Sequence, residues 1–318
     1  MKRFIAIALA LFGAAGCHRS EGAKVVRVAL QPLPLFGPVF VMKQKGWLED
    51  ELRKKGVSVQ WTSFQAGPPM NESFAAGEQD IGFMGDSPAI IGRASGQDTR
   101  IIGISSTGPR SLAVVVPTGS AIATPADLKG KKIGVVKGSF AHHLVVLVLQ
   151  AAHLGLDDVQ LINLTHADVA VALEKGDIDA GGIWEPLLTK LESEGKIRVL
   201  QDGTGIKKGA LVITARNAFA SRNPELVQTF LRLYKRGEEL VRDHPEEAAE
   251  LISRDVKLPP ERLRTVLAKS DFDPALHPDD VEELKRSEAF MRSVGITKTA
   301  VDIDAFIDGR YALAADVR

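Results

Sequence analysis

Glycines and small hydroxyl residues stand in this chain directly before predicted helices, where they are suited to binding an anion. Two stretches show the pattern, Gly85-Asp86-Ser87-Pro88 and Gly138-Ser139. The first N–H groups of a helix have no intrahelical partner and its amino end is partially positive, so both stretches offer backbone donors to a small anion. The hydroxyls of Ser87 and Ser139 are candidate additional donors. For each serine, ordinary N-capping is the alternative interpretation.

Further candidate ligand-binding residues follow other predicted strands. Trp184 ends one strand and offers an apolar wall with a ring N–H donor; packing between sheet and helix is the alternative. Asp86 and Glu185 would repel a simple anion but would attract an amine. Of the adjacent His142 and His143, we expect one near the site, because they point to different helix faces. The full candidate set is Gln31, Gly67, Asp86, Ser87, Ser106, Gly138, Ser139, His142, His166, Trp184 and Glu185.

The sequence contains little that would serve an enzyme. It has no G-x-S-x-G elbow, no phosphate-binding loop and no H-E-x-x-H motif. Its seven histidines include no i, i+4 pair, and its only cysteine is Cys17. We therefore expect no catalytic residue, no cofactor and no metal site. Lys plus Arg equal Asp plus Glu at 40 each, which leaves no basic field for nucleic acid.

The elements that must position these residues alternate between strand and helix, which is typical of an α/β fold. Apolar runs predict strands at 25–30, 57–64, 81–85, 100–105, 112–117, 133–136, 159–164, 178–184 and 210–215. Helices are predicted at 37–45, 69–76, 88–95, 140–154, 167–174 and 186–191. Most strand runs are nearly continuous in apolar residues, as in parallel strands covered on both faces. Ligands of such sheets bind beyond the carboxyl ends of the strands, where the candidate loops are expected to lie.

The last third of the chain is predicted to be helical. Pro224, Pro245, Pro260 and Pro278 are each expected to begin a helix, because proline at the first helical position loses no hydrogen bond. Gly295 is expected to end the last long helix.

A chain of 318 residues exceeds the usual size of one hydrophobic core, so the sequence predicts two lobes. One lobe comprises residues 25–114 plus 210–318, and the other comprises residues 115–209. Hinge crossings are expected near 112–117 and 209–213. Extended crossings absorb a lobe rotation through a few backbone dihedrals.

Residues 1–16 are predicted to be an export signal that is removed. Lys2 and Arg3 precede an apolar run that is too short to stay in a membrane. Small residues then lead to Cys17 in the order of a bacterial lipobox, so we expect Cys17 to be lipidated and residues 17–24 to form a linker. An ordinary secretory signal with an incidental cysteine is the alternative. The remaining chain is expected to work outside the cytoplasm at a membrane surface.

Five short motifs carry a family resemblance: DLKGKKIGV at 127–135, KGSFAH at 137–142, GDIDA at 176–180, IWEP at 183–186 and GDSP at 85–88. Together they resemble solute-binding proteins of ABC importers, of the aliphatic sulfonate, taurine and nitrate type. The first motif occurs in many binding proteins and marks the fold. The KGSFAH and IWEP motifs are narrower.

The resemblance implies a two-lobed, periplasmic-binding-protein-like fold of type II, with a mainly parallel sheet in each lobe and a helical C-terminal region. It implies a monomer that closes on a small organic anion and delivers it to an ABC permease, with no bond made or broken. Ser87, Ser139, His142 and Trp184 would be the inherited ligand contacts. The family usually has a tryptophan where this chain has Gly181-Gly182, and often a proline where it has His166. These departures predict a wider pocket and a bulkier or aromatic ligand.

Three alternatives remain open from the sequence. The same fold could bind a heterocyclic vitamin or thiamine-pyrimidine precursor for import. It could be an enzyme on this scaffold, although the export signal and the lack of a spare cysteine argue against that. It could also serve as the input domain of a sensor.

Overall fold

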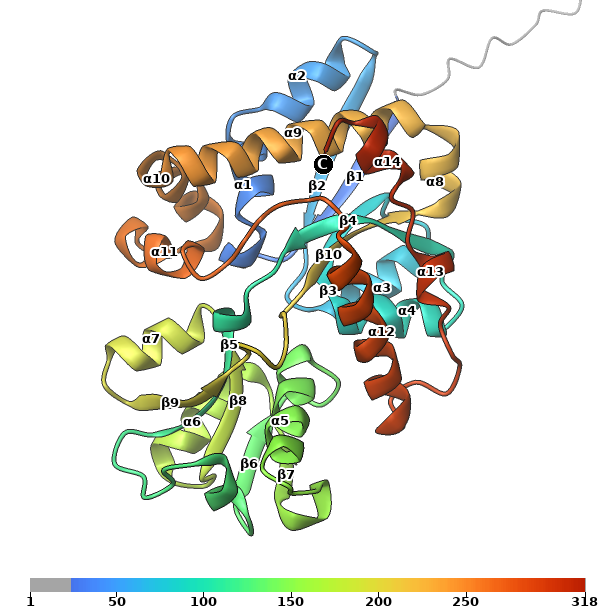
Figure 1. Ribbon diagram of the computed structural model, residues 1–318. Coiled ribbons are helices and arrows are strands. Elements are labelled where there is room, and N and C mark those ends of the chain that lie inside the picture. Colours follow the sequence, from blue (N-terminus) through green and yellow to red (C-terminus); the bar gives the residue numbers. More distant parts are fainter. Residues whose placement is uncertain (1–23, 318) are drawn as a thin grey trace, which may run out of the picture.

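The computed structural model describes residues 24–317, which form two five-stranded sheets flanked by helices (Figure 1). The predicted export signal at 1–16 and the predicted lipidation site Cys17 lie outside the described residues. Within residues 24–317, no helix is both long enough and apolar enough to span a membrane. The two sheets and the helical C-terminal region confirm the predicted fold class.

The first sheet has the order β2-β1-β3-β10-β4. Its strands are β1 (Lys24–Leu30), β2 (Val57–Ser63), β3 (Ile81–Gly85), β4 (Thr99–Ser106) and β10 (Leu211–Arg216). β1 pairs in parallel with β2 and β3, whereas β10 is antiparallel to β3 and β4. Phe83 and Met84 of β3 contribute to different apolar clusters, because successive side chains point to opposite faces of a sheet that helices cover on both sides.

The second sheet repeats this arrangement with the order β7-β6-β8-β5-β9. Its strands are β5 (Leu112–Pro117), β6 (Lys132–Val135), β7 (Gln160–Asn163), β8 (Ala180–Trp184) and β9 (Ile197–Asp202). β6 is parallel to β7 and β8, and β5 is antiparallel to β8 and β9. The sequence prediction omitted β9, a half-buried strand that mixes apolar residues with Arg, Gln and Asp, so its pattern is weak.

Helices pack on both faces of each sheet and form the whole C-terminal region (Figure 1). Those of the first part are α1 (Gly37–Gln44), α2 (Trp47–Arg53), α3 (Gly67–Ala75), α4 (Asp86–Ala94), α5 (Phe140–Ala151), α6 (His166–Lys175) and α7 (Leu187–Ser193). Those of the last part are α8 (Asn217–Arg222), α9 (Pro224–Asp243), α10 (Pro245–Val256), α11 (Pro260–Leu267), α12 (Pro278–Ser293), α13 (Ile303–Phe306) and α14 (Arg310–Ala314). α9 to α12 each begin on the predicted proline, and Gly295 follows α12 with a φ of +69°.

The chain passes between the two sheets twice, at residues 107–111 and 203–210, and the two crossings lie side by side. The N–H of Gly108 donates to the carbonyl of Lys208 at 2.9 Å, and that of Gly203 to the carbonyl of Pro109 at 2.7 Å. The crossings predicted at 112–117 and 209–213 are therefore displaced. Residues 112–117 form β5 in full and residues 211–213 belong to β10, because apolar runs at both places pair into a sheet instead of linking the two sheets.

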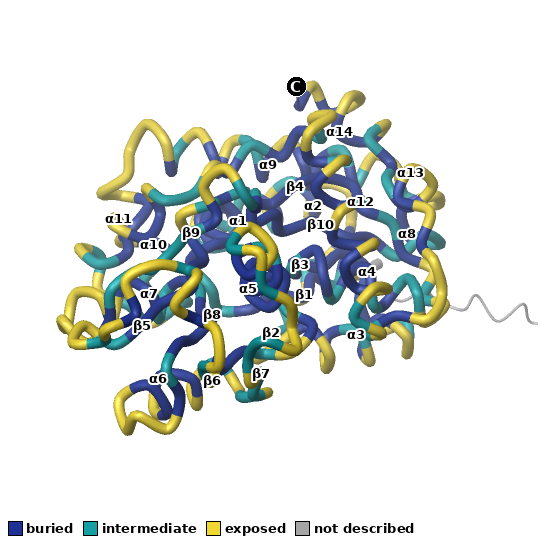
Figure 2. The backbone as a smooth tube through the Cα atoms, turned by 60° about the horizontal axis from the view of Figure 1, so that its bottom comes forward, coloured by how far each residue is buried: buried dark blue, intermediate teal, exposed yellow. Residues whose placement is uncertain are grey.

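Each sheet has its own apolar core, and the dark blue segments in Figure 2 follow the strands and the helix faces against them. α9 supplies Phe230 and Tyr234 to the core of the first sheet, and α5 supplies Leu144 and Val148 to that of the second. A smaller cluster joins Val146 of α5 to α12. α12 also packs on α4, so it contacts helices associated with both sheets.

Candidate functional site

The amino end of α4 carries Asp86 and Ser87, which follow β3 at the carboxyl end of the first sheet. Both residues are fully buried. Oδ1 of Asp86 accepts hydrogen bonds from the backbone N–H of Ser87 at 2.6 Å and from its hydroxyl at 3.0 Å. The predicted donor Ser87 therefore already donates to its neighbour. Its role as a ligand contact stays a prediction.

Asp86 belongs to a buried ionic cluster centred on Lys207, a residue of the second crossing. Nζ of Lys207 lies 3.2 Å from Oδ2 of Asp86 and 2.8 Å from Oε1 of Glu283 on α12. Ser287, also on α12, donates to Oδ2 of Asp86 at 2.5 Å. Burial by itself would raise the pKa of Asp86, but Lys207, Ser287 and Ser87 hold that pKa below its usual value. Asp86 is therefore ionised and paired within the protein.

The amino end of α5 carries Gly138, Ser139 and His142. Gly138 has a φ of +82°, which favours glycine. Oγ of Ser139 accepts the N–H of His142 at 3.1 Å as the N-cap, so the capping alternative holds for Ser139. The N–H of Gly138 donates to Nδ1 of His142 at 3.2 Å, which leaves the proton of a neutral ring on Nε2. Burial lowers the pKa of His142 to about 4.

The Nε2–H of His142 is a donor without a partner among the described residues, and it is buried. A buried donor without a hydrogen bond is costly, so this atom is suited to a ligand. The loop before α5 also approaches α4. A Cβ at Gly138 would lie 3.9 Å from Cδ1 of Ile91, about one turn along α4 from Ser87. The same Cβ would lie closer to Ile296, which follows α12, at 3.3 Å. Asp86 at the start of α4 is near enough to α5 for its charge to act on His143.

Trp184, at the end of β8, forms an aromatic cluster with His166 and Phe140. The rings of His166 and Trp184 are stacked, with centroids 3.7 Å apart and planes 6° apart. The Phe140 ring lies 5.2 Å from that of Trp184. Trp184 packs against the main apolar clusters of both sheets, so it lies where the two sheets face each other. Nε2 of His166 accepts the backbone N–H of Trp184 at 3.3 Å, and burial lowers the pKa of His166 to about 4.

Glu185 is fully buried and is bound within the protein. Its carboxylate accepts Thr189 through the backbone N–H at 3.1 Å and through the hydroxyl at 2.7 Å. Nζ of Lys269 lies 2.6 Å from Oε1. We expected Asp86 and Glu185 to be available to a ligand amine, but in the structure both carboxylates are already paired within the protein. Each carboxylate faces a lysine that a distant part of the chain supplies.

The remaining candidates have structural contacts of their own. The side chain of Gln31 donates to the carbonyl of Phe83 at 3.2 Å, and the hydroxyl of Ser106 donates to the carbonyl of Leu35 at 2.8 Å. A Cβ at Gly67 would lie 2.5 Å from Cβ of Pro88, so this position permits the close approach of α3 to the first turn of α4. Their contact with a ligand stays a prediction.

The expected widening of the pocket at Gly181-Gly182 is wrong. Both glycines are buried within β8. A Cβ at Gly181 would lie 2.7 Å from Cγ1 of Val169, and one at Gly182 would lie 2.8 Å from Cγ2 of Val145. Side chains at these positions would point into the helices that cover the sheet. Core residues already occupy that space, so the two glycines do not enlarge the pocket beside Trp184.

Sequence reasoning missed Lys207, Lys269 and Phe290. The ring of Phe290 stacks on His143 at 4.2 Å and meets His142 edge-on at 5.2 Å, so α12 covers the start of α5. A lysine beside a predicted crossing was the signal available for Lys207. No local pattern marks Lys269, since its partner Glu185 lies 84 positions away in the chain.

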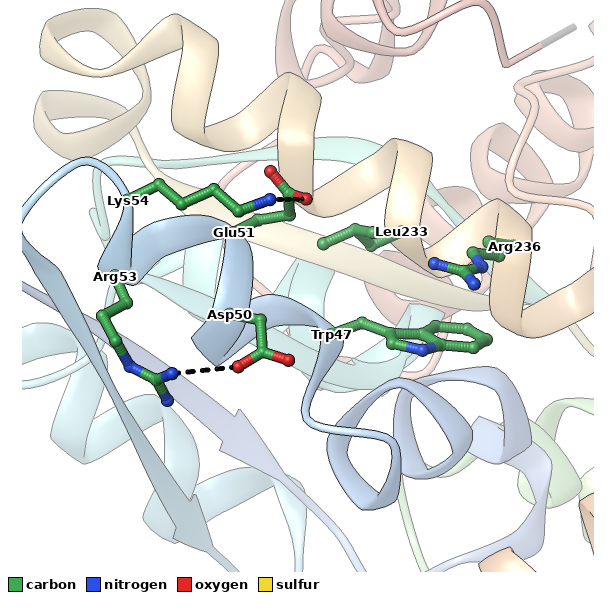
Figure 3. A pocket seen from close by; sticks show the side chains of 7 residues that line it. All are labelled: Trp47, Asp50, Glu51, Arg53, Lys54, Leu233 and Arg236. Atoms are coloured by element: carbon green, nitrogen blue, oxygen red, sulfur yellow. Dashed lines mark hydrogen bonds and ion pairs between the residues drawn. The ribbon is translucent and has the colours of Figure 1, made fainter.

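A surface hollow between α2 and α9 shares no residue with these loops (Figure 3). Its acidic residues are paired locally, since Arg53 lies 3.1 Å from Asp50 and Lys54 lies 2.7 Å from Glu51. The hollow is therefore separate from the candidate site. Over residues 24–317, no group of three or more His, Cys, Asp or Glu side chains is arranged to hold a metal ion.

Comparisons with known proteins agree with this architecture. The family model described as NMT1/THI5 like matches residues 34–248. A putative aliphatic sulfonates-binding protein of Bacillus subtilis is 31% identical over 303 residues, which cover 94% of this chain and 90% of that protein. One of Escherichia coli is 34% identical over 209 residues, covering 66% of each chain.

Solved structures show the same fold. The periplasmic aliphatic sulphonate binding protein of Escherichia coli superimposes with a TM-score of 0.82 at 28% identity, covering 89% of this chain and 97% of that one. The alkanesulfonate-binding protein of Xanthomonas axonopodis pv. citri, bound to MOPS, gives 0.78 at 25% identity, covering 89% and 98%. A desulfurization enzyme shares the fold alone, at 19% identity and a TM-score of 0.71. With the family model matching more than half of its length, this chain belongs to the NMT1/THI5-like family.

Proposed function

We propose that this protein is the extracytoplasmic solute-binding receptor of an ABC importer, and that its ligand is a small organic sulfonate. The observation that carries the proposal is the amino end of α5, which lies near Asp86 of α4 and beside the aromatic cluster of Trp184. The neutral His142 adds a buried N–H without a partner among the described residues. Backbone donors and an unpaired N–H suit the three oxygens of a sulfonate, and the rings suit its carbon chain.

The names of the similar proteins support the same ligand class. The Bacillus and Escherichia relatives are named for aliphatic sulfonates, and a third relative is named as a taurine-binding periplasmic protein. Those names describe the relatives alone. For this chain, the unpaired N–H of His142 and the rings around Trp184 support the same proposal.

Capture would proceed by closure of two lobes on the ligand. We assign residues 24–106 plus 211–317 to one lobe and residues 112–202 to the other, joined by the paired crossings at 107–111 and 203–210. A ligand that binds both lobes stabilises the closed form, because it shifts an equilibrium only by its difference in affinity for the two states. The permease would then recognise the closed form of the monomer.

The binding experiment is titration of purified protein with linear alkanesulfonates from methane- to pentanesulfonate, followed by calorimetry and thermal unfolding. A ligand at 100 times its Kd adds about 2.7 kcal/mol to the free energy of unfolding. Sulfate and the matching alkanecarboxylates are the controls. Absence of any binding across the sulfonate series would overturn the proposal. Recovery of the ligand with unchanged mass separates a receptor from a desulfurization enzyme.

A variant pair tests the role of α5. Ser139→Leu places a bulky side chain at the cap and is expected to weaken sulfonate binding by about tenfold or more, equal to about 1.4 kcal/mol. Ser193→Leu, at the exposed end of α7, is the matched control and should bind as the unchanged protein does. Equal affinity of the two variants would remove Ser139 from the site.

We also propose that the protein is held at the membrane by a lipid on Cys17. Support comes from the order of basic, apolar and small residues before the only cysteine. Cells fed radiolabelled palmitate should label the protein, whereas the Cys17→Ala variant should carry no label. Equal labelling of both forms, or of neither, would overturn the anchor and would leave the receptor function standing.

A further inference from the structure

Lys269 belongs, by its backbone, to the part of the molecule built on the first sheet. Its neighbours Leu267 and Phe272 lie in the core cluster of that sheet. The next residues are bound to the first crossing: the N–H of Asp271 donates to the carbonyl of Thr107 at 2.7 Å, and the N–H of Thr107 donates to the carbonyl of Asp271 at 2.8 Å. The backbone at Lys269 is therefore held against the first sheet and the first crossing.

The ammonium of Lys269 reaches a loop of the second sheet. Nζ lies 2.6 Å from Oε1 of Glu185 and 2.9 Å from the hydroxyl of Thr189. The side chain of Glu185 has no exposed surface and that of Lys269 is 17% exposed. Water screens the attraction between these two charges only weakly, and the loss of either partner leaves the other charge buried and unpaired, which is strongly destabilising.

Glu185 directly follows Trp184, so the ion pair acts on the aromatic cluster. The backbone N–H of Glu185 donates to the carbonyl of Ser111 in the first crossing at 2.9 Å, and Trp184 packs against the cores of both sheets. The loop that carries Trp184 is thus bound to its own sheet by the backbone and to the opposite lobe by Lys269.

We propose that Lys269 is a positioning residue that ties the Trp184–Glu185 loop to the opposite lobe and thereby favours the closed arrangement. In this proposal Lys269 acts on the site through Glu185 and not by contact with the ligand. The part of this proposal that concerns ligand retention rests on the proposed receptor function. The part that concerns the loop and the lobes holds for the protein without ligand.

The experiment uses the full chain in a background with Trp47→Phe and Trp61→Phe, which leaves Trp184 as the only tryptophan of three. Lys269→Met is compared with the double variant Lys269→Met, Glu185→Gln. Lys196→Met is the matched control, because Lys196 makes exposed ion pairs with Glu174 and Glu194 that stay within the second lobe. Readouts are Trp184 emission, the radius of gyration by X-ray scattering, thermal unfolding and the dissociation rate of 1-propanesulfonate.

We expect Lys269→Met to shift Trp184 emission to longer wavelength and to enlarge the radius of gyration. It should also raise the dissociation rate about tenfold, because a less favoured closed form opens more often and releases the ligand. Lys196→Met should change none of these. The double variant distinguishes positioning from mere stability. It removes the unpaired carboxylate, so it should recover thermal stability while emission and dissociation rate stay altered.

Two results would overturn the proposal: unchanged emission and dissociation rate in Lys269→Met, or recovery of both in the double variant. If Lys269→Met does not fold, the Trp184 emission and the dissociation rate of the double variant are compared directly with those of the unchanged protein. If the unchanged protein binds no sulfonate, the receptor function fails, and emission and scattering without ligand still decide whether Lys269 positions the loop.

Discussion

The imidazole of His166 and the indole of Trp184 lie face to face, with ring centroids 3.7 Å apart. The same imidazole accepts the backbone N–H of Trp184 through Nε2 at 3.3 Å. His166 begins α6 and Trp184 ends β8, so one side chain sets both the backbone and the ring of the aromatic wall.

Removal of the His166 ring should therefore disturb ligand binding without unfolding the protein. His166→Ala is expected to weaken sulfonate binding about tenfold, whereas His166→Phe, which keeps a flat ring, should lose less. Calorimetry gives the comparison. The exposed His153, replaced by Asn at its positive φ, is the control. A His166→Ala protein with unchanged affinity would show that the stack serves packing alone.

Lys207 is expected to be essential for stability because it pairs with two buried carboxylates. Lys207→Met leaves Asp86 buried without a cation and Glu283 with Arg286 alone, which should cost about 3–5 kcal/mol in free energy of unfolding. Urea unfolding measures the loss. Lys285→Met on the same helix α12 breaks only exposed pairs and should cost less than about 1 kcal/mol. Equal losses in the two variants would contradict the role of the cluster.

The two occupied carboxylates predict selectivity between ligands of similar size. Taurine carries an ammonium where 1-propanesulfonate carries a methyl group. Because Asp86 and Glu185 are both paired with lysines, neither is available to an ammonium, and its desolvation would go uncompensated. We expect 1-propanesulfonate to bind at least tenfold more tightly, as measured by competition calorimetry. Tighter binding of taurine would mean that a carboxylate is released on closure.

Stability should fall on mild acidification because of two buried histidines, His142 and His143, and the half-buried His166. Burial lowers the pKa of His142 and of His166 to about 4 and that of His143 to about 3, whereas an unfolded chain binds these protons near pH 6.5. Stability is therefore complete above about pH 6.5 and is lost as pH falls toward 4, by at most about 1.4 kcal/mol per pH unit for each histidine.

Urea unfolding at pH 7.5, 6.0 and 5.0 measures this slope. His143→Phe keeps a ring against Phe290 and removes one titrating group, so its slope should be shallower than that of the unchanged protein. His153→Asn, at an exposed position, should retain the full slope. Identical slopes for His143→Phe and the unchanged protein would assign the acid sensitivity to other groups.

The glycines of β8 should matter for packing and not for the ligand. A Cβ at Gly182 would lie 2.8 Å from Val145 and 3.1 Å from Val135, so Gly182→Ala is expected to cost about 1–3 kcal/mol through overpacking. Its sulfonate affinity should stay unchanged once the protein is folded. Gly119→Ala, where a Cβ meets nothing within 4 Å, is the control. Altered ligand selectivity in Gly182→Ala would show that Gly182 borders the ligand pocket.

Much of the architecture could be predicted because it depends on local patterns. Continuous apolar runs placed the strands on which the candidate loops stand, and four prolines placed the starts of α9 to α12. Burial on both sheet faces and the fixed φ of proline are properties of short segments. The weakly patterned β9 escaped prediction because a half-buried strand with mixed residues looks like a loop.

The sequence by itself thus determined which loops lie at the carboxyl ends of the strands and which residues they carry. Only the tertiary structure decided which of those residues are already occupied. Asp86 meets Lys207 across 121 positions of sequence, and Glu185 meets Lys269 across 84. The local sequence around a loop carboxylate is the same whether that carboxylate binds a ligand or a buried lysine. The difference depends on the packing of segments far apart in the chain, which only the tertiary structure shows.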